Sequence, residues 1–218
     1  DAGTLNCYKV CQDKGVKATF FLVGEHADYK HGKTILETMK KDMRHFIFAN
    51  HSYSHANNRY EYFYKNEGKA FLDFMRFHDS MKFSFPIARF PGNPAWVMEN
   101  NNIRTSRLTK PLTRLMDSVG YNVMGWDVEW NFDKSSRPVQ SAELMAKQIM
   151  NAFESKSSFV KNHVVLLTHD RMFREPVYKD SLVKMITLLQ SKKGIVFETA
   201  DQYPLIKKND KTLIAARY

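Results

Sequence analysis

The chain alternates between two patterns of hydrophobic and polar residues. Apolar side chains three or four positions apart predict helices over residues 5–14, 35–43, 71–78, 112–119, 144–153 and 182–189. Short, mostly apolar runs between them predict strands over residues 16–23, 45–50, 87–90, 121–127, 163–167 and 195–198. Helix and strand therefore follow each other along the whole sequence.

This alternation predicts the fold class. The run 163–167 is apolar at nearly every position, which is typical of a strand in a parallel sheet with both faces covered. Ser141 is expected to cap the helix that turns Leu144, Met145, Ile149 and Phe153 inward. We therefore expect an α/β protein with a parallel sheet or barrel, and with its chemistry on loops at the carboxyl ends of the strands.

The composition fits a single globular domain spanning residues 1–218. Of 218 residues, 43% are hydrophobic and 13% aromatic, and no linker or repeat divides them. Cys7 and Cys11 lie four positions apart on a predicted helix, so we expect buried thiols rather than a disulfide. No apolar run is long enough to cross a bilayer. The start at Asp1 rather than methionine is compatible with an export signal that has been removed.

The charge indicates an anionic partner without identifying it. The formal net charge is +10 and the pI about 9.5, which favours nucleic acid, phospholipid headgroups or an acidic wall polymer. The basic residues are spread along the chain, as on a generally basic surface, and no nucleic-acid-binding motif is present. We therefore expect no nucleic-acid partner.

The segment His51-Ser52-Tyr53-Ser54-His55 sets two imidazoles four positions apart, directly after a predicted strand. If the strand end turns into a helical loop, both rings face one side and can bind one small ion. The segment has no glutamate like that of H-E-x-x-H zinc peptidases, so a catalytic base must come from elsewhere.

Other polar residues stand at the ends of further predicted strands. Arg89 ends one strand, Asp127 and Glu129 close another, and His169-Asp170 close a fourth. Because the carboxyl ends of parallel strands share one edge of a sheet, these groups are candidates for a common site.

Four motifs resemble the polysaccharide deacetylases, the NodB-like family 4 carbohydrate esterases that remove acetyl groups from peptidoglycan, chitin and xylan. The histidine segment matches the family's H-[ST]-x-x-H metal motif, and residues 16–24 look like its second strand. Arg89-Phe90-Pro91-Gly92 is similar to the R-x-P motif, and Leu167-Thr168-His169 to the final L-x-H. The resemblance implies a distorted, incomplete (β/α) barrel of mainly parallel strands with one divalent ion, commonly zinc.

The resemblance also implies roles for these residues. His51 and His55 would bind the ion, and His169 would be the general acid that protonates the departing amine. Arg89 would orient an aspartate base through a forked hydrogen bond, and the backbone N–H of Gly92 would donate to the oxyanion.

Two positions depart from the family pattern. If Asp1-Ala2-Gly3 matches the family's D-D-G, Asp1 is the base and Ala2 has replaced the third protein ligand of the metal. Otherwise the motif and the first strand lie upstream of the sequence. The family's D-x-x-D-W is represented by Asp127-Val128-Glu129-Trp130, so Asp127 or Glu129 would tune His169, and Asp133 is a third candidate.

Two tryptophans are candidate sugar contacts. Trp96 and Trp130 follow the Arg89 motif and the acidic motif, on loops expected at the site. An aromatic face in such a loop can stack on a sugar ring, although large aromatics more often pack in the interior.

We therefore predict a metal-dependent hydrolase that removes acetyl groups from an N-acetylhexosamine polymer of the cell wall or envelope, secreted, periplasmic or envelope-bound. The alternative is a carbohydrate-binding relative that has lost catalysis through its altered metal site, as Ala2 in a ligand position would imply.

Overall fold

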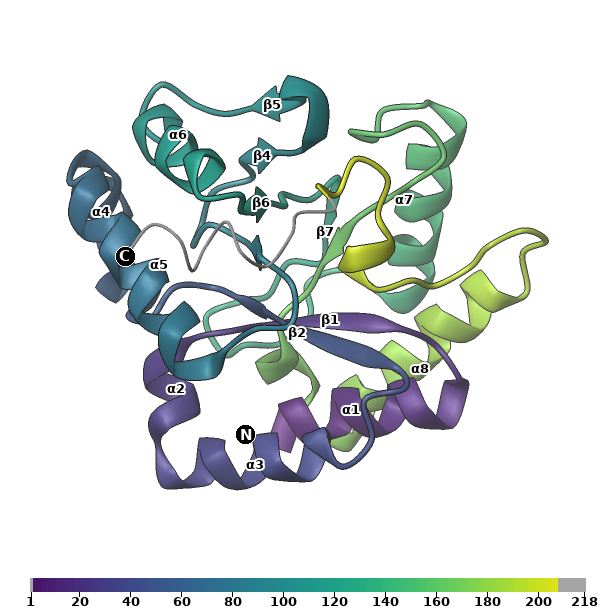
Figure 1. Cartoon of the computed structure of the whole chain (residues 1–218). Helices are drawn as coiled ribbons and strands as arrows, with labels where there is room; N and C mark the ends of the chain where they lie inside the picture. The colour runs from purple at the N-terminus through teal and green to yellow at the C-terminus, as the bar shows by residue number, and fades with distance from the viewer. Residues whose placement is uncertain (1, 208–218) are drawn as a thin grey trace. The chain divides into compact units, whose positions relative to one another are not determined.

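The computed structural model describes residues 2–207 (Figure 1). Its α-helices are α1 (Ala2–Lys14), α2 (Gly24–Asp28), α3 (Lys30–Lys40), α4 (Tyr60–Lys65), α5 (Glu67–Met81), α6 (Lys110–Ser118), α7 (Ala142–Glu154) and α8 (Pro176–Gln190). Its strands are β1 (Ala18–Leu22), β2 (Phe46–Asn50), β3 (Ile87–Ala88), β4 (Trp96–Val97), β5 (Ile103–Arg104), β6 (Asn122–Val123), β7 (Val128–Glu129) and β8 (Leu166–Leu167). Short 3-10 helices are η1 (His55–Asn58), η2 (Glu99–Asn101), η3 (Asp170–Phe173) and η4 (Ala200–Gln202).

The predicted helices are confirmed, with one error of orientation. Ser141 caps α7 as expected, because its hydroxyl accepts from the backbone N–H of Leu144 at 3.2 Å. Leu144 itself is 45% exposed, whereas Met145 and Ile149 are buried. The inward stripe of α7 thus begins one position later than predicted, which turns Leu144 about 100° away from the core.

The strands were predicted less well. The runs 121–127 and 163–167 form only the two-residue strands β6 and β8, and the antiparallel β4 and β5 were not predicted. The predicted strand 195–198 is wrong: this segment is not a strand, Val196 is 74% exposed, and Glu198 forms an exposed ion pair with Lys17 at 2.8 Å. An apolar run needs a neighbouring strand to pair with, and the hydrophobic pattern does not supply one.

The strands form two sheets, one of them in the order β1-β2-β3-β6-β4-β5 and the other β7-β8. The pairs β2–β3, β3–β6 and β7–β8 are parallel, whereas β4 runs antiparallel to both of its neighbours. A mixed α/β fold with parallel strands is therefore confirmed, and the incomplete barrel remains a prediction.

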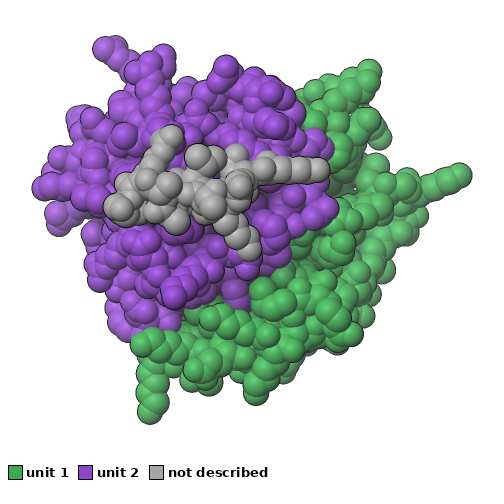
Figure 2. All heavy atoms as spheres, in the orientation of Figure 1, with its two compact units in different colours: residues 1–18, 30–46, 126–199 green, residues 19–29, 47–125, 200–218 purple. Residues whose placement is uncertain are grey.

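The chain divides into two compact units, each made of segments far apart in sequence (Figure 2). Unit 1 consists of Asp1–Ala18, Lys30–Phe46 and Trp126–Thr199, and unit 2 of Thr19–Tyr29, Ile47–Gly125 and Ala200–Tyr218. The assignment of one domain to residues 1–218 stays a prediction.

Unit 2 has a core of aromatic and aliphatic side chains between α5, α6 and the larger sheet. Its members are Tyr64, Ala70, Phe74, Met75, Ala88, Phe90, Ala95, Val97, Leu112, Met116, Val119, Tyr121 and Val123. Burying each large side chain contributes roughly 1.5 to 3 kcal/mol, so this core fixes the sheet from which the polar loops emerge.

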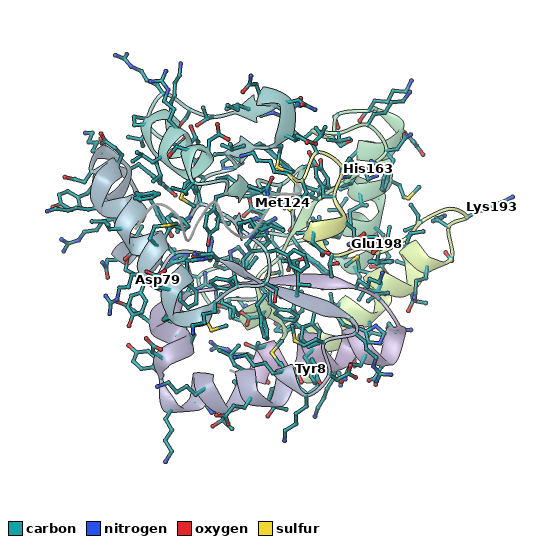
Figure 3. The ribbon with its side chains drawn as sticks, viewed as in Figure 1. Tyr8, Asp79, Met124, His163, Lys193 and Glu198 are labelled. Carbon is teal, nitrogen blue, oxygen red and sulfur yellow. The ribbon has the colours of Figure 1, made fainter. Side chains whose placement is uncertain are left out.

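In unit 1, α1 packs against α8 and η3, and α7 packs against α8. Tyr8, labelled in Figure 3, meets Phe46 edge to face at 5.2 Å. Cys7 and Cys11 are buried free thiols, as predicted, and burial raises the pKa of Cys11 to about 11. Among residues 2–207, no helix combines the length and hydrophobicity that crossing a membrane requires.

Candidate functional site

In unit 2, two of the predicted site residues leave neighbouring parallel strands side by side. Asn50 at the end of β2 lies opposite Ala88 of β3. His51 follows β2 and Arg89 follows β3, and the Arg89 N–H donates to the Asn50 carbonyl at 2.9 Å. The expectation that strand ends bring these residues together is therefore correct here.

The two motif histidines face each other. Their ring centroids lie 5.0 Å apart at an interplanar angle of 61°. The turn that brings them together differs from the expected one, because Ser52 (φ 65°) and all of η1, from His55 (φ 49°) to Asn58 (φ 56°), adopt left-handed backbone conformations. Such conformations cost non-glycine residues about 1 kcal/mol or more each, and the surrounding structure must offset this strain.

A hydrogen bond fixes the tautomer of His51. Its Nδ1 lies 2.8 Å from the carbonyl oxygen of Arg89, and because a carbonyl can only accept, Nδ1 carries the hydrogen. In this tautomer Nε2 is the ring nitrogen that carries the lone pair, which is the usual arrangement of a metal-binding histidine. Within residues 2–207 no group of three His, Cys, Asp or Glu side chains could hold an ion. The candidate ligands among the described residues are therefore the two imidazoles, and metal binding stays a prediction.

Two side chains that sequence reasoning missed hold the loop between the histidines. One carboxylate oxygen of Asp73, on α5, accepts from the backbone N–H groups of Tyr53 at 3.0 Å and Ser54 at 3.1 Å. The side-chain oxygen of the fully buried Asn50 accepts from the Ser52 N–H at 2.9 Å, and its nitrogen donates to a carbonyl of α5 at 2.9 Å. No motif marks Asp73, because its role depends on where α5 packs.

Arg89 is buried and donates to backbone carbonyls. Its Nε donates to the Met124 carbonyl at 3.0 Å and its Nη2 to the Gly125 carbonyl at 2.9 Å; Figure 3 labels Met124. Its guanidinium lies 4.1 Å from the centre of the Phe21 ring. Burial lowers the pKa of Arg89 to about 9, so the group stays charged at neutral pH. Its predicted carboxylate partner, Asp1, lies outside the described residues, and the orienting role stays a prediction.

The turn that follows Arg89 favours glycine. Gly92 has φ +60°, and a Cβ added to it would lie 3.2 Å from the ring of Tyr60. The hydroxyl of Tyr64 donates to the Pro91 carbonyl at 2.5 Å and holds the turn from the core side. The Tyr60 ring also lies 5.9 Å from that of His55, so it adjoins both a candidate ligand and the candidate oxyanion donor.

In unit 1, His169 lies two residues after the end of β8 and directly before η3. Its backbone is extended (φ −119°, ψ 126°). Its ring packs edge to face against the Phe132 ring, with the two ring centroids 4.8 Å apart. The next residue, Asp170, accepts a hydrogen bond from the Thr4 hydroxyl of α1. The histidine is thus held at a strand end, as predicted.

Glu129 and Asp127, two of the acidic candidates for tuning His169, differ in their surroundings. Glu129 of β7 lies opposite Leu167 of β8, the last residue of that strand and two positions before His169. Asp127 instead accepts from the backbone N–H groups of Phe159 at 2.7 Å and Val165 at 2.8 Å. Which of these acids tunes His169 stays a prediction.

Asp133 belongs to an exposed turn. It forms an ion pair with Arg137 at 2.8 Å and also accepts from the Arg137 backbone N–H at 2.9 Å. Hydrogen bonds from Arg137 lower the pKa of Asp133. Its carboxylate is thus engaged in the local turn.

Both tryptophans proposed as sugar contacts are fully buried, so that expectation is wrong. Trp96 lies in β4 and stacks on Tyr203 at 5.6 Å. The ring centroids of Trp130 and Phe173 lie 5.4 Å apart, and the ring N–H of Trp130 donates a hydrogen bond to the Gln140 carbonyl at 2.9 Å. Their large apolar surfaces stabilise the two units, and neither ring presents a face to a ligand.

Ala2 opens α1 and has no side chain able to bind a metal. Since Asp1 is not described, its role as base and the placing of the family's first motif stay predictions.

Comparison with known proteins supports the family resemblance. A family model described as polysaccharide deacetylase matches residues 1–73, which include both motif histidines. No curated protein sequence matches the chain.

Solved structures share the fold over most of the chain. A chitin deacetylase from Colletotrichum lindemuthianum is 16% identical with a TM-score of 0.63, covering 91% of this chain and 80% of its own. The peptidoglycan deacetylase structure from Bacillus subtilis is 17% identical with a TM-score of 0.58, covering 92% and 82%. A mutant described as a CE4 family pseudoenzyme with restored enzymatic activity is 15% identical with a TM-score of 0.59, covering 91% and 61%. The resemblance to the polysaccharide deacetylases is thus confirmed, in sequence over residues 1–73 and in fold over most of the chain.

Proposed function

We propose that this protein is a metal-dependent deacetylase of an N-acetylhexosamine polymer, with a chitin-like or peptidoglycan glycan as its substrate. The observation that carries the proposal is the pair of facing imidazoles, of which His51 is fixed by the Arg89 carbonyl in the tautomer that suits a metal ligand. The fold shared with a chitin deacetylase and a peptidoglycan deacetylase supports the substrate class.

In this proposal His51 and His55 hold one divalent ion, for which zinc is the first candidate. Such an ion would supply Lewis-acid chemistry at the acetyl group. The chain's own residues would do the rest: the Gly92 N–H would donate to the carbonyl oxygen as negative charge develops there. His169 would donate a proton to the departing nitrogen, because imidazole exchanges protons near neutral pH.

The remaining charged residues would support these steps. Asp1 would accept a proton from the attacking water, and Arg89 would hold that carboxylate in position. Glu129 would stabilise the charged form of His169. Action on an envelope glycan also implies work outside the cytoplasm, and we propose a secreted, periplasmic or envelope location.

The direct test is release of acetate from N-acetylglucosamine oligomers and from purified peptidoglycan strands. The protein is stripped with a chelator, reloaded with Zn²⁺ and compared with the stripped sample, and mass spectrometry identifies the free amine. Acetate release that depends on the metal is expected. Equal rates with and without metal would remove the metal from the proposal, and no release from any acetylated glycan would refute the deacetylase.

A second candidate is a carbohydrate-binding protein without catalysis. Ala2, which cannot bind a metal, and a described donor set of two imidazoles favour it. It predicts that the oligomers bind, as measured by calorimetry, without release of acetate.

A further inference from the structure

Tyr60 occupies a position that no motif assigned. It is the first residue of α4, and its ring adjoins both the His55 ring, at 5.9 Å, and Gly92, where an added Cβ would lie 3.2 Å away. The side chain nevertheless remains 36% exposed, in contrast to the fully buried Trp96 and Trp130. Part of an aromatic side chain next to the candidate ligand is thus accessible from solvent.

The surface beside Tyr60 is hollowed. A shallow depression of about 470 Å³ is lined by Arg59, Tyr60, Glu61, Tyr62 and Lys65. Glu61 and Lys65 form an ion pair at 2.6 Å, so these two charges largely cancel. Tyr62, 63% exposed, adds a second aromatic side chain.

We propose that Tyr60 is a substrate-contacting residue of unit 2, and that the depression beside it receives a neighbouring sugar of the glycan. The inference rests on the proposed deacetylase function and names the surface that would bind the polymer. A pyranose presents a face of C–H groups and a rim of hydroxyls. The aromatic rings of Tyr60 and Tyr62 can pack against the C–H face of the sugar. The charged groups of Arg59 and Glu61 can form hydrogen bonds with its hydroxyls.

The geometry ties this contact to the reacting group. Because the Tyr60 ring lies against Gly92 and beside His55, a sugar packed on it would have its N-acetyl group close to the proposed oxyanion donor and ligand. Tyr60 is therefore expected to affect substrate affinity more than the chemical step.

The test compares steady-state kinetics on N-acetylglucosamine oligomers for four variants of the zinc-loaded protein. Tyr60→Ala and Tyr60→Leu, which lack a flat ring, should raise KM about 10-fold and change kcat by less than about 3-fold. Tyr60→Phe, which keeps the ring, should stay within about 2-fold of the parent KM. Tyr29→Ala is the matched control, because Tyr29 is also in unit 2, is 65% exposed and does not line the depression.

Metal content is measured for each variant and should be unchanged. Loss of zinc from Tyr60→Ala would make Tyr60 a support of His55 and overturn the inference. A parent-like KM in Tyr60→Ala would also overturn the inference. So would a parent-like KM in Tyr60→Leu, because an apolar side chain without a flat ring would then be sufficient. Should the parent bind oligomers without deacetylating them, the same comparison is made on Kd. If the parent neither binds nor deacetylates, the proposed function fails together with this inference, whereas a parent-like Tyr60→Ala in an active protein refutes the inference alone.

Discussion

The two groups of candidate residues are held in different ways. In unit 2 the loop from His51 to His55 is held by several hydrogen bonds. The His51 N–H donates to the Leu22 carbonyl at 2.8 Å, and the side chains of Asn50 and Asp73 accept hydrogen bonds from the peptide N–H groups that follow. In unit 1 His169 is an extended residue between β8 and η3, next to an aromatic edge. The difference fits the two proposed tasks, since metal ligands must stay at a fixed separation, whereas a general acid needs a position from which to give up a proton.

The largest effect is expected from the histidine pair. Replacing both His51 and His55 by alanine should abolish uptake of Zn²⁺, because it removes the adjacent imidazole pair and the described residues contain no group of three His, Cys, Asp or Glu side chains that could hold the ion instead. Metal stoichiometry is measured after dialysis against a weak chelator. His26→Ala, at an exposed histidine of α2, is the control and should bind metal normally. Parent-like stoichiometry in the double variant would contradict the assignment.

His169 should affect the chemistry and spare the metal. His169→Ala is expected to lower kcat by about 10² to 10⁴-fold with unchanged metal content, as for loss of a general acid. His163→Ala is the matched control in unit 1, since His163 is exposed and labelled in Figure 3. If His169→Ala loses metal instead, His169 is a ligand.

Replacing Asp73 tests whether the hydrogen bonds that hold the loop between the two histidines contribute to metal binding. Asp73→Ala leaves two peptide N–H groups of the loop without their acceptor and should weaken Zn²⁺ binding by about 10 to 100-fold. Calorimetric titration gives the dissociation constant, and thermal unfolding is measured in parallel. Asp79→Ala, on the same helix and labelled in Figure 3, should bind Zn²⁺ like the parent. Equal affinities for both variants would mean that the strained turn holds the histidines unaided.

Replacing Asp127 is expected to change mainly stability, and replacing Glu129 mainly catalysis. Asp127→Asn replaces one of the two carboxylate oxygens, each of which accepts a backbone hydrogen bond, with an N–H₂ group that cannot accept, and should lower the free energy of unfolding by about 1 to 3 kcal/mol. Glu129→Gln should leave stability within about 0.5 kcal/mol, because Glu129 is not fully buried. It should also lower kcat and shift its pH profile. The opposite pattern in the two variants would make Asp127 the partner of His169.

Local patterns in the sequence determined the helices, the early strands and the residues that follow them. The i, i+3, i+4 spacing was sufficient for α1, α3, α5, α6, α7 and α8, because a helix satisfies its own backbone hydrogen bonds. The histidine and arginine motifs were recognisable because His51 and Arg89 stand directly after β2 and β3, where candidate site residues are expected.

Tertiary structure decided whatever depends on a partner distant in sequence. Residues 195–198 have an apolar pattern but do not form a strand, since a strand exists only where another lies beside it to accept its hydrogen bonds. The same dependence applies to the candidate site. Trp96 and Trp130 are buried in the cores of their units. Asp73 and Tyr60, on helices that follow the histidine loop in sequence, contact that loop in the folded chain. A sequence specifies which side chains can bind or stack, and only the folded chain determines which of them are buried and which are brought together.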